Sequence, residues 1–410
     1  MHGDDGSMKI LHLCLACSYV DKYSYQENLL PKYHKKMGYD VEIIASLETF
    51  DKKGNRCMIP SVPLPYENED GILVVRLPYR DNRKLSRKLR RYAGLREALE
   101  FSSPDILFIH GCQFSDIDVV TSYLKEHLEV DVYVDNHADK NNSASTFLSE
   151  YIVHRLLWRK AAHAILPYAK KFWGVLPARV SFMMEQYGVP AEKCALLPMG
   201  GDDEEVDRAC NSDSIMSVYE ELRIPKDNLL IVTGGKIDSN KPQVLSLMRA
   251  FTRLDLDRAN LLVFGPVLAD MEQEFNVLLN DDNRIVYLPW ATPSESYRYF
   301  AAASLVVFPG KHSVYWEQAA SVGSPLLVRK WPGLGHLDGG GNVLYIEDDS
   351  VDLFTASLRK ASEADTLKAM RASAERVAVR FRYSDIAKQS ICESIASVPR
   401  TQTQMRSERD

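Results

Sequence analysis

The first half of the chain alternates short apolar runs with segments whose apolar residues recur at helical spacing. The apolar runs are KILHLCLA, YDVEIIAS, DILFIHG and VDVYVDNH, and helical patterns such as YQENLLPKYHKKMG and DIDVVTSYLKEH stand between them. A long helical pattern, FLSEYIVHRLLWRKA, follows. Alternation of this kind is typical of βαβ units, which build a parallel sheet. We therefore expect a doubly wound α/β domain in this half.

A second series of apolar runs begins beyond residue 225 with LLIVTGG, NLLVFG, RIVYLPW, SLVVFPG and SPLLVRK. Helices are expected between them at 242–254, 294–303 and 314–322. The stretch ALLPMGGDDEEVDRACNSDS joins the two series, and we interpret its acidic run without periodicity as a linker. The pattern predicts an N-terminal Rossmann-like domain over 8–200 and a second over 201–383. A crossover helix at about 384–400 is expected to return to the first domain, before a disordered tail at 401–410.

Composition and charge narrow the class of protein. The chain has 410 residues and a formal net charge of −6, so it has no overall basic field and we expect no nucleic-acid partner. Its seven cysteines are scattered, which favours buried thiols in a reducing compartment over disulfides or a zinc site. No run approaches the roughly 20 apolar residues of a transmembrane helix, and the first residues lack the core of a signal peptide. We expect a cytoplasmic protein, with peripheral contact at the inner face of the membrane as a possibility to test.

Several segments of the second half occur in an order that marks a known family: TGGKIDSNK, FGPV, YLPWATPSESY, FPGKHSVYWEQAASVGSP and GGGNV. With DNHAD and YGVPAEKCALLPMGGD in the first half, they resemble the retaining glycosyltransferases of family four (glycosyl transferases group 1). The resemblance extends from about Met8 to about Ser397. It implies the GT-B fold, in which two Rossmann-like doubly wound domains face across a cleft. Two features differ from the family pattern: the loop SYVDKYSYQEN has no glycine, and Pro309 stands where the first of two glutamates is usual.

The loop after the strand LLIVTG carries the candidates for the leaving diphosphate. A reaction that builds negative charge on a phosphate without a metal ion needs fixed cations and backbone N–H groups. Gly235, Lys236 and Lys241 precede a helix expected to begin near Pro242, whose amino end adds partial positive charge. The resemblance assigns both lysines to the diphosphate. Without it, they could equally be solvated loop residues.

The other donor-binding candidates follow two later strands: Trp290, Gly310, His312, Ser313, Val314 and Glu317. The glycine allows close approach of the backbone to a ligand, and the following N–H groups would face phosphate or sugar hydroxyls. By the resemblance, Glu317 accepts hydrogen bonds from the ribose, and Trp290 lies beside the base. The alternatives are a glutamate that only favours the helix dipole and a plain core or edge aromatic.

Two histidines close strands of the first half. His137 in DNHAD and His110 in FIHGC stand where parallel strands end, the edge at which such sheets bind ligands. His137 is the stronger catalytic candidate, because a histidine there can hydrogen-bond the transferred sugar. The alternative for each is a satisfied core histidine.

A basic segment, RDNRKLSRKLRRYAGLREALE, precedes the strand DILFIH. Its cations recur at helical spacing beside an apolar stripe, and those we assign to an acceptor or membrane patch, together with His110, are Arg83, Lys84, Arg87, Lys88 and Arg91. One interpretation is a solvated helix face. The other is a surface for anionic lipid or for the diphosphate of a lipid-linked acceptor.

These expectations combine into one functional hypothesis. The chain would be a retaining, metal-independent glycosyltransferase without a cofactor, acting in polysaccharide or lipopolysaccharide assembly. It would move a sugar from a nucleotide-diphosphate sugar, uridine rather than guanosine, to a glycan or lipid-linked acceptor. No Asp-x-Asp signature follows a strand, so no metal ligand is assigned. The alternatives are a non-catalytic two-domain sugar-nucleotide binding protein and another GT-B activity, such as an epimerase or a phosphorylase.

Overall fold

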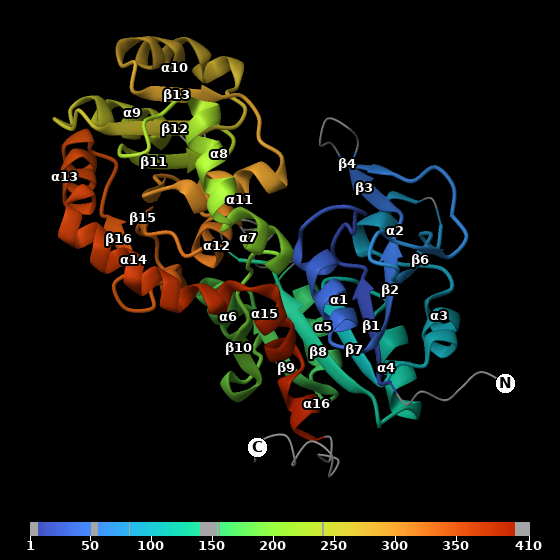
Figure 1. The fold of residues 1–410 in the computed structure, drawn as a ribbon. Coiled ribbons are helices and arrows are strands. Elements are labelled where there is room, and N and C mark those ends of the chain that lie inside the picture. Colours follow the sequence, from blue (N-terminus) through green and yellow to red (C-terminus); the bar gives the residue numbers. More distant parts are fainter. Residues whose placement is uncertain are drawn as a thin grey trace, which may run out of the picture. The chain divides into compact units, whose positions relative to one another are not determined.

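The computed structural model describes residues 7–50, 56–81, 83–139, 154, 156–239 and 242–397. The chain divides into two compact units (Figure 1), of which the first comprises Met1–Leu197 with Ala387–Asp410 and the second Pro198–Ile386. The boundary proposed from the sequence lay after residue 200. Each unit contains a sheet of mainly parallel strands covered by helices, as the alternating pattern predicted.

The sheet of the first unit has the order β10-β9-β8-β7-β1-β2-β6-β5. All neighbouring strands are parallel except β5, which is antiparallel to β6. The strands are β1 (Lys9–Cys14), β2 (Asp40–Ser46), β5 (Tyr66–Glu67), β6 (Leu73–Leu77), β7 (Ile106–His110), β8 (Asp131–Asn136), β9 (Ala169–Gly174) and β10 (Cys194–Leu196). Two short strands, β3 (Glu48–Phe50) and β4 (Arg56–Met58), form a separate antiparallel pair.

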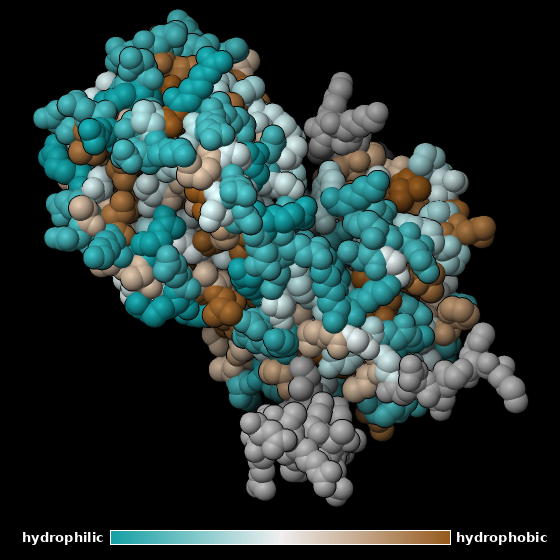
Figure 2. Space-filling view, in the orientation of Figure 1, coloured by the Kyte–Doolittle hydropathy of each residue, from teal (hydrophilic) through white to brown (hydrophobic). Residues whose placement is uncertain are grey.

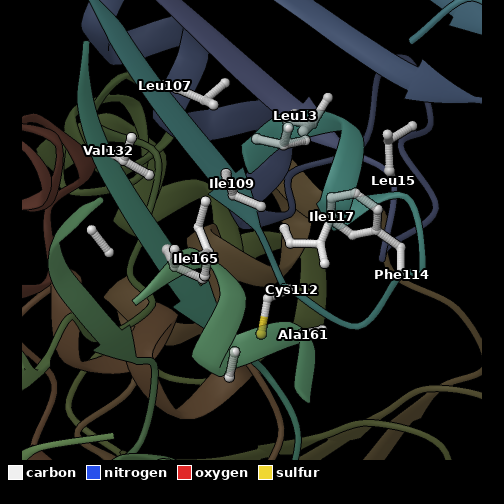
Figure 3. Packing of buried hydrophobic residues seen from close by; sticks show 14 of the residues in the cluster. Leu13, Leu15, Leu107, Ile109, Cys112, Phe114, Ile117, Val132, Ala161 and Ile165 are labelled. Atoms are coloured by element: carbon white, nitrogen blue, oxygen red, sulfur yellow. The ribbon is translucent and has the colours of Figure 1, made fainter. Parts of the chain in front are cut away.

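Helices cover the sheet and explain why its central strands are apolar throughout. Leu107 and Ile109 of β7 pack towards Ile117 and Ile165 of the covering helices (Figure 3), so the strand is buried along its whole length. The helices of this unit are α1 (Gln26–Lys36), α2 (Lys84–Leu89), α3 (Leu95–Ser102), α4 (Ile117–Glu126), α5 (Arg159–Ile165), α6 (Pro177–Phe182) and α16 (Cys392–Ser397). The predicted helix over 147–161 lies mostly outside the described residues.

The second unit contains a wholly parallel sheet in the order β13-β12-β11-β14-β15-β16. Its strands are β11 (Leu229–Gly234), β12 (Ala259–Phe264), β13 (Ile285–Leu288), β14 (Leu305–Phe308), β15 (Leu326–Arg329) and β16 (Val343–Ile346). Its helices are α7 (Asp203–Ala209), α8 (Ser212–Leu222), α9 (Gln243–Thr252), α10 (Ala269–Asp281), α11 (Pro293–Ala302), α12 (Tyr315–Ser321), α13 (Val351–Ser362) and α14 (Ala364–Ala378). Helix α15 (Tyr383–Ser390) continues the chain to the C-terminal part of the first unit.

The predicted linker is only partly correct: the division between the units falls within this stretch, after Leu197, but its acidic run forms helix α7. Asp202 caps this helix by accepting a hydrogen bond from the backbone N–H of Glu204, and three acidic residues occupy the first turn. Carboxylates in this position are stabilised by the partial positive charge of the helix amino end. Asn211 caps α8 in the same way. The acidic run is therefore a helix of the second unit, directly after the division between the units.

The basic segment also differs from its predicted form, a single amphipathic helix. It is divided into α2 and α3, because Arg90 and Gly94 both have positive φ, of 53° and 78°. A left-handed residue ends a helix by turning the chain away from the helical path. The cations of the segment therefore do not share one helical face.

Among the described residues, no helix is long and apolar enough to cross a membrane. The face drawn in Figure 2 is mostly hydrophilic, with hydrophobic residues scattered over it. Scattered apolar residues are normal on protein surfaces and need no special function.

Candidate functional site

Each sheet has a point at which the strand order reverses, and candidate residues lie at both. In the first unit the reversal lies between β1 and β7, and in the second between β11 and β14. Open parallel sheets bind ligands at the carboxyl ends of the strands beside such a reversal. The two sites are described in turn.

A cavity of about 780 Å³ lies in the first unit at this edge of the sheet. The loops after β1, β7 and β8 line it through Cys17, Gly111 and His137 respectively, and α1 contributes Glu27. The sequence had placed His110 and His137 at strand ends, and the structure brings both to this cavity. Its lining also includes the cations of α2 and of the turn that follows it.

Asp135, the last but one residue of β8, joins the two histidines. Its Oδ2 lies 2.9 Å from Nδ1 of His110 and 3.4 Å from Nε2 of His137. Asp135 is fully buried and His110 nearly so, whereas the side chain of His137 is 38% exposed. Burial alone would raise the pKa of Asp135, but the adjacent His137 and His110 lower it well below its usual range. Asp135 is therefore an ionised carboxylate that orients the exposed histidine from behind.

Behind His110 lie two further histidines that the sequence interpretation did not select. Nε2 of His110 is 2.9 Å from Nδ1 of His12 on β1, and Nε2 of His12 is 3.0 Å from Nδ1 of His34 on α1. The available signal was a histidine in the middle of an apolar strand, KILHLC, and another within a largely buried helix. Their connection depends on packing between segments far apart in the sequence.

The predicted basic patch is only partly assembled. Arg87 and Lys88 line the cavity, together with Arg90, which donates a hydrogen bond to the carbonyl of Gln113. Arg83 instead forms an ion pair with Asp81, at 2.6 Å. Arg91 is exposed, and nothing is described of the side chain of Lys84. The cavity therefore gathers part of the basic segment next to the histidines.

In the second unit, the loop after β11 is held close to the loop after β12. Gly235 has a φ of +131°, Gly265 has a φ of +119°, and a Cβ on Gly265 would lie 2.3 Å from the carbonyl oxygen of Gly235. Only glycine tolerates this combination of conformation and approach. Lys236 follows with a half-exposed side chain whose Nζ is 3.2 Å from Oδ2 of Asp238. Lys241 lies outside the described residues.

Glu317 on α12 is fully buried between two histidines. Its Oε1 is 2.7 Å from Nε2 of His312, which follows β14, and 2.8 Å from Nε2 of His336. Burial would raise the pKa of this carboxyl, but His312 and His336 lower it to about 2. The second oxygen, Oε2, is buried and has no hydrogen-bond partner among the described residues. The site therefore holds an ionised carboxylate with one buried oxygen that no described group hydrogen-bonds.

The same three side chains form a group that could hold a metal ion, because their ligand atoms lie within 4.8 Å of one another. Imidazole and carboxylate are ligands that Zn²⁺ accepts. A metal ion on Nε2 of His336 would, however, leave its hydrogen on the buried Nδ1, which has no partner among the described residues. Ligating histidines almost always donate that hydrogen to an acceptor. The atoms present suit the hydrogen-bonded arrangement better than a metal centre.

The remaining donor candidates differ in their surroundings. Trp290 is 69% exposed, so it is not a core residue. Gly310 is buried, and its carbonyl accepts a hydrogen bond from Nε1 of Trp331. Ser313 and Val314 are partly buried just before α12. Trp290 is thus accessible to a planar ligand, whereas Gly310 lies beneath the surface.

Comparison of the sequence with protein-family models and with curated proteins finds no match. Comparison of the structure does find matches. Sucrose-phosphate synthase from Thermosynechococcus elongatus aligns with a TM-score of 0.63 and 15% identity, covering 95% of this chain and 100% of that one. HepE from Anabaena in complex with UDP-glucose aligns with a TM-score of 0.61 and 15% identity, over 95% and 100% of the two chains. A putative UDP-N-acetylglucosamine 2-epimerase from Listeria monocytogenes aligns with a TM-score of 0.62 and 12% identity, over 96% and 98%.

At such low identity these likenesses concern the fold. They extend over nearly the whole chain, and they confirm the expected α/β class with parallel sheets. The chain therefore has the GT-B fold that the sequence motifs predicted.

Proposed function

We propose that the chain is a retaining glycosyltransferase that uses a nucleotide-diphosphate sugar, with uridine as the preferred nucleoside. The observation that carries the proposal is the buried, ionised Glu317, whose Oε2 lacks a partner among the described residues at the sheet edge where Lys236 also lies. A carboxylate accepts hydrogen bonds from the two ribose hydroxyls, and an ammonium group stabilises a diphosphate. HepE, which shares the fold, is described in complex with UDP-glucose, and this supports the choice of nucleotide.

The proposed chemistry assigns separate tasks to the two units. Lys236 and Lys241, with the amino end of α9, would stabilise the charge that develops on the leaving diphosphate, which removes the need for a metal ion there. His137 would hydrogen-bond the transferred sugar, and Asp135 would hold its ring in place. The leaving phosphate would itself accept the proton of the acceptor hydroxyl, so no protein nucleophile is required.

The acceptor is proposed to be a glycan or lipid-linked glycan that carries negative charge, in polysaccharide or lipopolysaccharide assembly. Arg87, Lys88 and Arg90 line the cavity that also holds His137, and these cations would bind a phosphate group of the acceptor. We propose that the protein acts on the cytoplasmic side of a membrane through the same basic surface.

Liposome co-sedimentation tests the membrane part of this proposal. The double variant Arg87→Glu/Arg91→Glu should bind vesicles with anionic lipid less than the parent, because each basic residue near a charged surface contributes roughly 1 kcal/mol. The matched control is Arg258→Glu/Arg380→Glu, which reverses two other exposed charges. Equal sedimentation of the parent and of the first variant would remove the membrane role.

Early NMR spectra of the released sugar test the reaction itself. With UDP-glucose as the donor and water as a substitute acceptor, α-glucose should appear first, at the same rate with and without a chelator. Initial release of β-glucose would contradict retention. Release of a sugar inverted at C2 would instead support an epimerase, the activity named for one protein of the same fold.

A further inference from the structure

Three buried histidines in the first unit form one continuous hydrogen-bonded series. His12 and His34 are fully buried, and His110 is 2% exposed. The series begins at Asp135, passes through His110 and His12, and ends at His34. Nε2 of His34 then lies 3.1 Å from the carbonyl oxygen of Ala387 and 3.0 Å from Oγ of Ser390. The C-terminal segment of this unit therefore forms the inner end of the series.

The carbonyl of Ala387 determines the position of every hydrogen in the series. A carbonyl oxygen can only accept a hydrogen bond, and Ser390 donates its hydroxyl hydrogen to this carbonyl and not to His34, so Nε2 of His34 must carry a hydrogen. Neutral His34 then accepts through Nδ1, which requires a hydrogen on Nε2 of His12. By the same argument, His12 accepts through Nδ1 from the N–H at Nε2 of His110. The direction of donation thus runs from His110 inward to the C-terminal segment.

The carboxylate at the other end adds one more hydrogen. Nδ1 of His110 lies 2.9 Å from Oδ2 of Asp135, and a carboxylate is also only an acceptor. His110 must therefore carry a hydrogen on both nitrogens, whereas His12 and His34 carry one each. A second charged ring is disfavoured because adjacent rings in the series would then repel each other without water to screen them.

The pKa values agree with this distribution of hydrogens. Burial and the neighbouring histidine charges lower the pKa of His12 well below its ordinary value, and burial lowers that of His34 to about 4. Burial also lowers the pKa of His110, but Cys14 and Asp135 outweigh it and raise the value to about 9.

The other titratable groups that face this cluster come from three elements. Cys14 lies on β1, Glu27 lies on α1, and Cys17 follows β1 in the lining of the cavity. His137 is the remaining neighbour, through its contact with Asp135. The thiols and Glu27 add negative charge or hydrogen-bonding capacity near His110, whereas the cations Arg87, Lys88 and Arg90 line the same cavity.

We propose that His12 and His34 are positioning residues that hold one extra proton on His110, so that Asp135 stays ionised and keeps the ring of His137 oriented in the cavity. The relay, defined as His34, His12 and His110, rests on the proposed function only in its last step, where His137 meets the sugar. Because the series ends at the carbonyl of Ala387, the charge on His110 beneath the cavity also depends on the packing of the C-terminal segment against His34.

The hydrogens themselves can be counted by NMR of the whole protein labelled with ¹⁵N in histidine. At pH 7.5, His110 should show two protonated nitrogens, and His12 and His34 should each show a hydrogen on Nε2 only. The ten histidines of the chain are assigned by single substitutions. A neutral ring at His110, or a hydrogen on Nδ1 of His12, would overturn the proposal.

Two substitutions of His34 distinguish a role in the hydrogen-bonded relay from a role in packing alone. His34→Leu removes the acceptor for His12, and the pKa of His110 should fall by about one to two units, as expected when a charge-assisted hydrogen bond is lost. His34→Gln keeps an amide donor towards Ala387 and a carbonyl acceptor towards His12, so it should restore most of the shift. His163→Leu, in the same unit, controls for loss of a histidine that contacts a backbone carbonyl outside the relay.

The pH profile of UDP-glucose turnover provides the functional readout. The parent should keep its kcat up to about pH 9, the pKa of His110, and His34→Leu should lose it at lower pH while His34→Gln resembles the parent. Equal profiles for all three proteins would overturn the positioning role. Absence of turnover with the NMR pattern intact would instead contradict the proposed function and leave the relay standing.

Discussion

Replacing Glu317 with glutamine tests the donor site most informatively, because it removes the charge and nearly preserves the shape. The amide oxygen can still accept from His312 and His336, at the positions where Oε1 now lies 2.7 and 2.8 Å from their Nε2 atoms. Alanine would instead leave the N–H groups of both histidines without this acceptor, and it would open a cavity. Loss of nucleotide binding in an alanine variant could then result from unfolding.

The magnitude follows from the pKa of the carboxyl. A folded value of about 2 against an ordinary 4.5 corresponds to about 3 kcal/mol of stability at neutral pH. Because the folded pKa is lowered, this contribution is present above about pH 4.5 and is lost as the pH falls through about 2. The free energy of unfolding of Glu317→Gln should therefore be lower by that order at pH 7 and should depend less on pH in this window.

Calorimetric titration with UDP measures the binding role separately. If the ribose hydroxyls donate to the carboxylate, loss of its charge should cost about 1.5–3 kcal/mol, or roughly 10–100-fold in Kd. The matched control is Glu295→Gln, since Glu295 is a partly buried glutamate whose role is the capping box of α11. An unchanged Kd in a Glu317→Gln protein that remains folded would refute the assignment to ribose.

Three further results are expected. Lys236→Ala should lower turnover by on the order of 100-fold, as loss of one charge-stabilising donor does, while the exposed Lys360→Ala should not; near-normal steady-state rates would remove the diphosphate role. Gly265→Ala should lower the melting temperature, because its Cβ would lie 2.3 Å from a backbone oxygen, whereas Gly335→Ala meets nothing within 4 Å. Since the folded pKa of His110 is raised to about 9, its contribution to stability is full below about pH 6.5 and is lost as the pH rises through 9. Denaturant titrations that show no loss between these values would contradict that charge.

The strands were predictable because their signal is local. DILFIH and SLVVF are continuous apolar runs, and the structure buries β7 and β14 throughout. Residues at strand ends, such as His137 and Lys236, could be selected for the same reason. Helix α7 was not predicted, because its acidic run lacks apolar periodicity. The N-cap at Asp202 was the signal for a helix there.

The partners of the site residues could not be predicted, since they depend on long-range packing. His336 meets Glu317 across 19 positions of the chain, from a short turn with no motif of its own. His34 meets Ala387 across 353 positions. The run of basic residues could be recognised from the sequence. The left-handed conformation of Arg90, which divides the run between two helices, could not be predicted, because arginine rarely adopts that conformation.

The central claim, that the second unit binds a nucleotide-diphosphate sugar, is tested most directly by thermal denaturation with added nucleotides. The protein is heated with UDP, GDP and ADP and with their glucose conjugates, in the presence of a chelator. Selective stabilisation by UDP and UDP-glucose is predicted, by about 2.7 kcal/mol at a hundredfold excess over Kd. Unchanged melting with every nucleotide would contradict the claim.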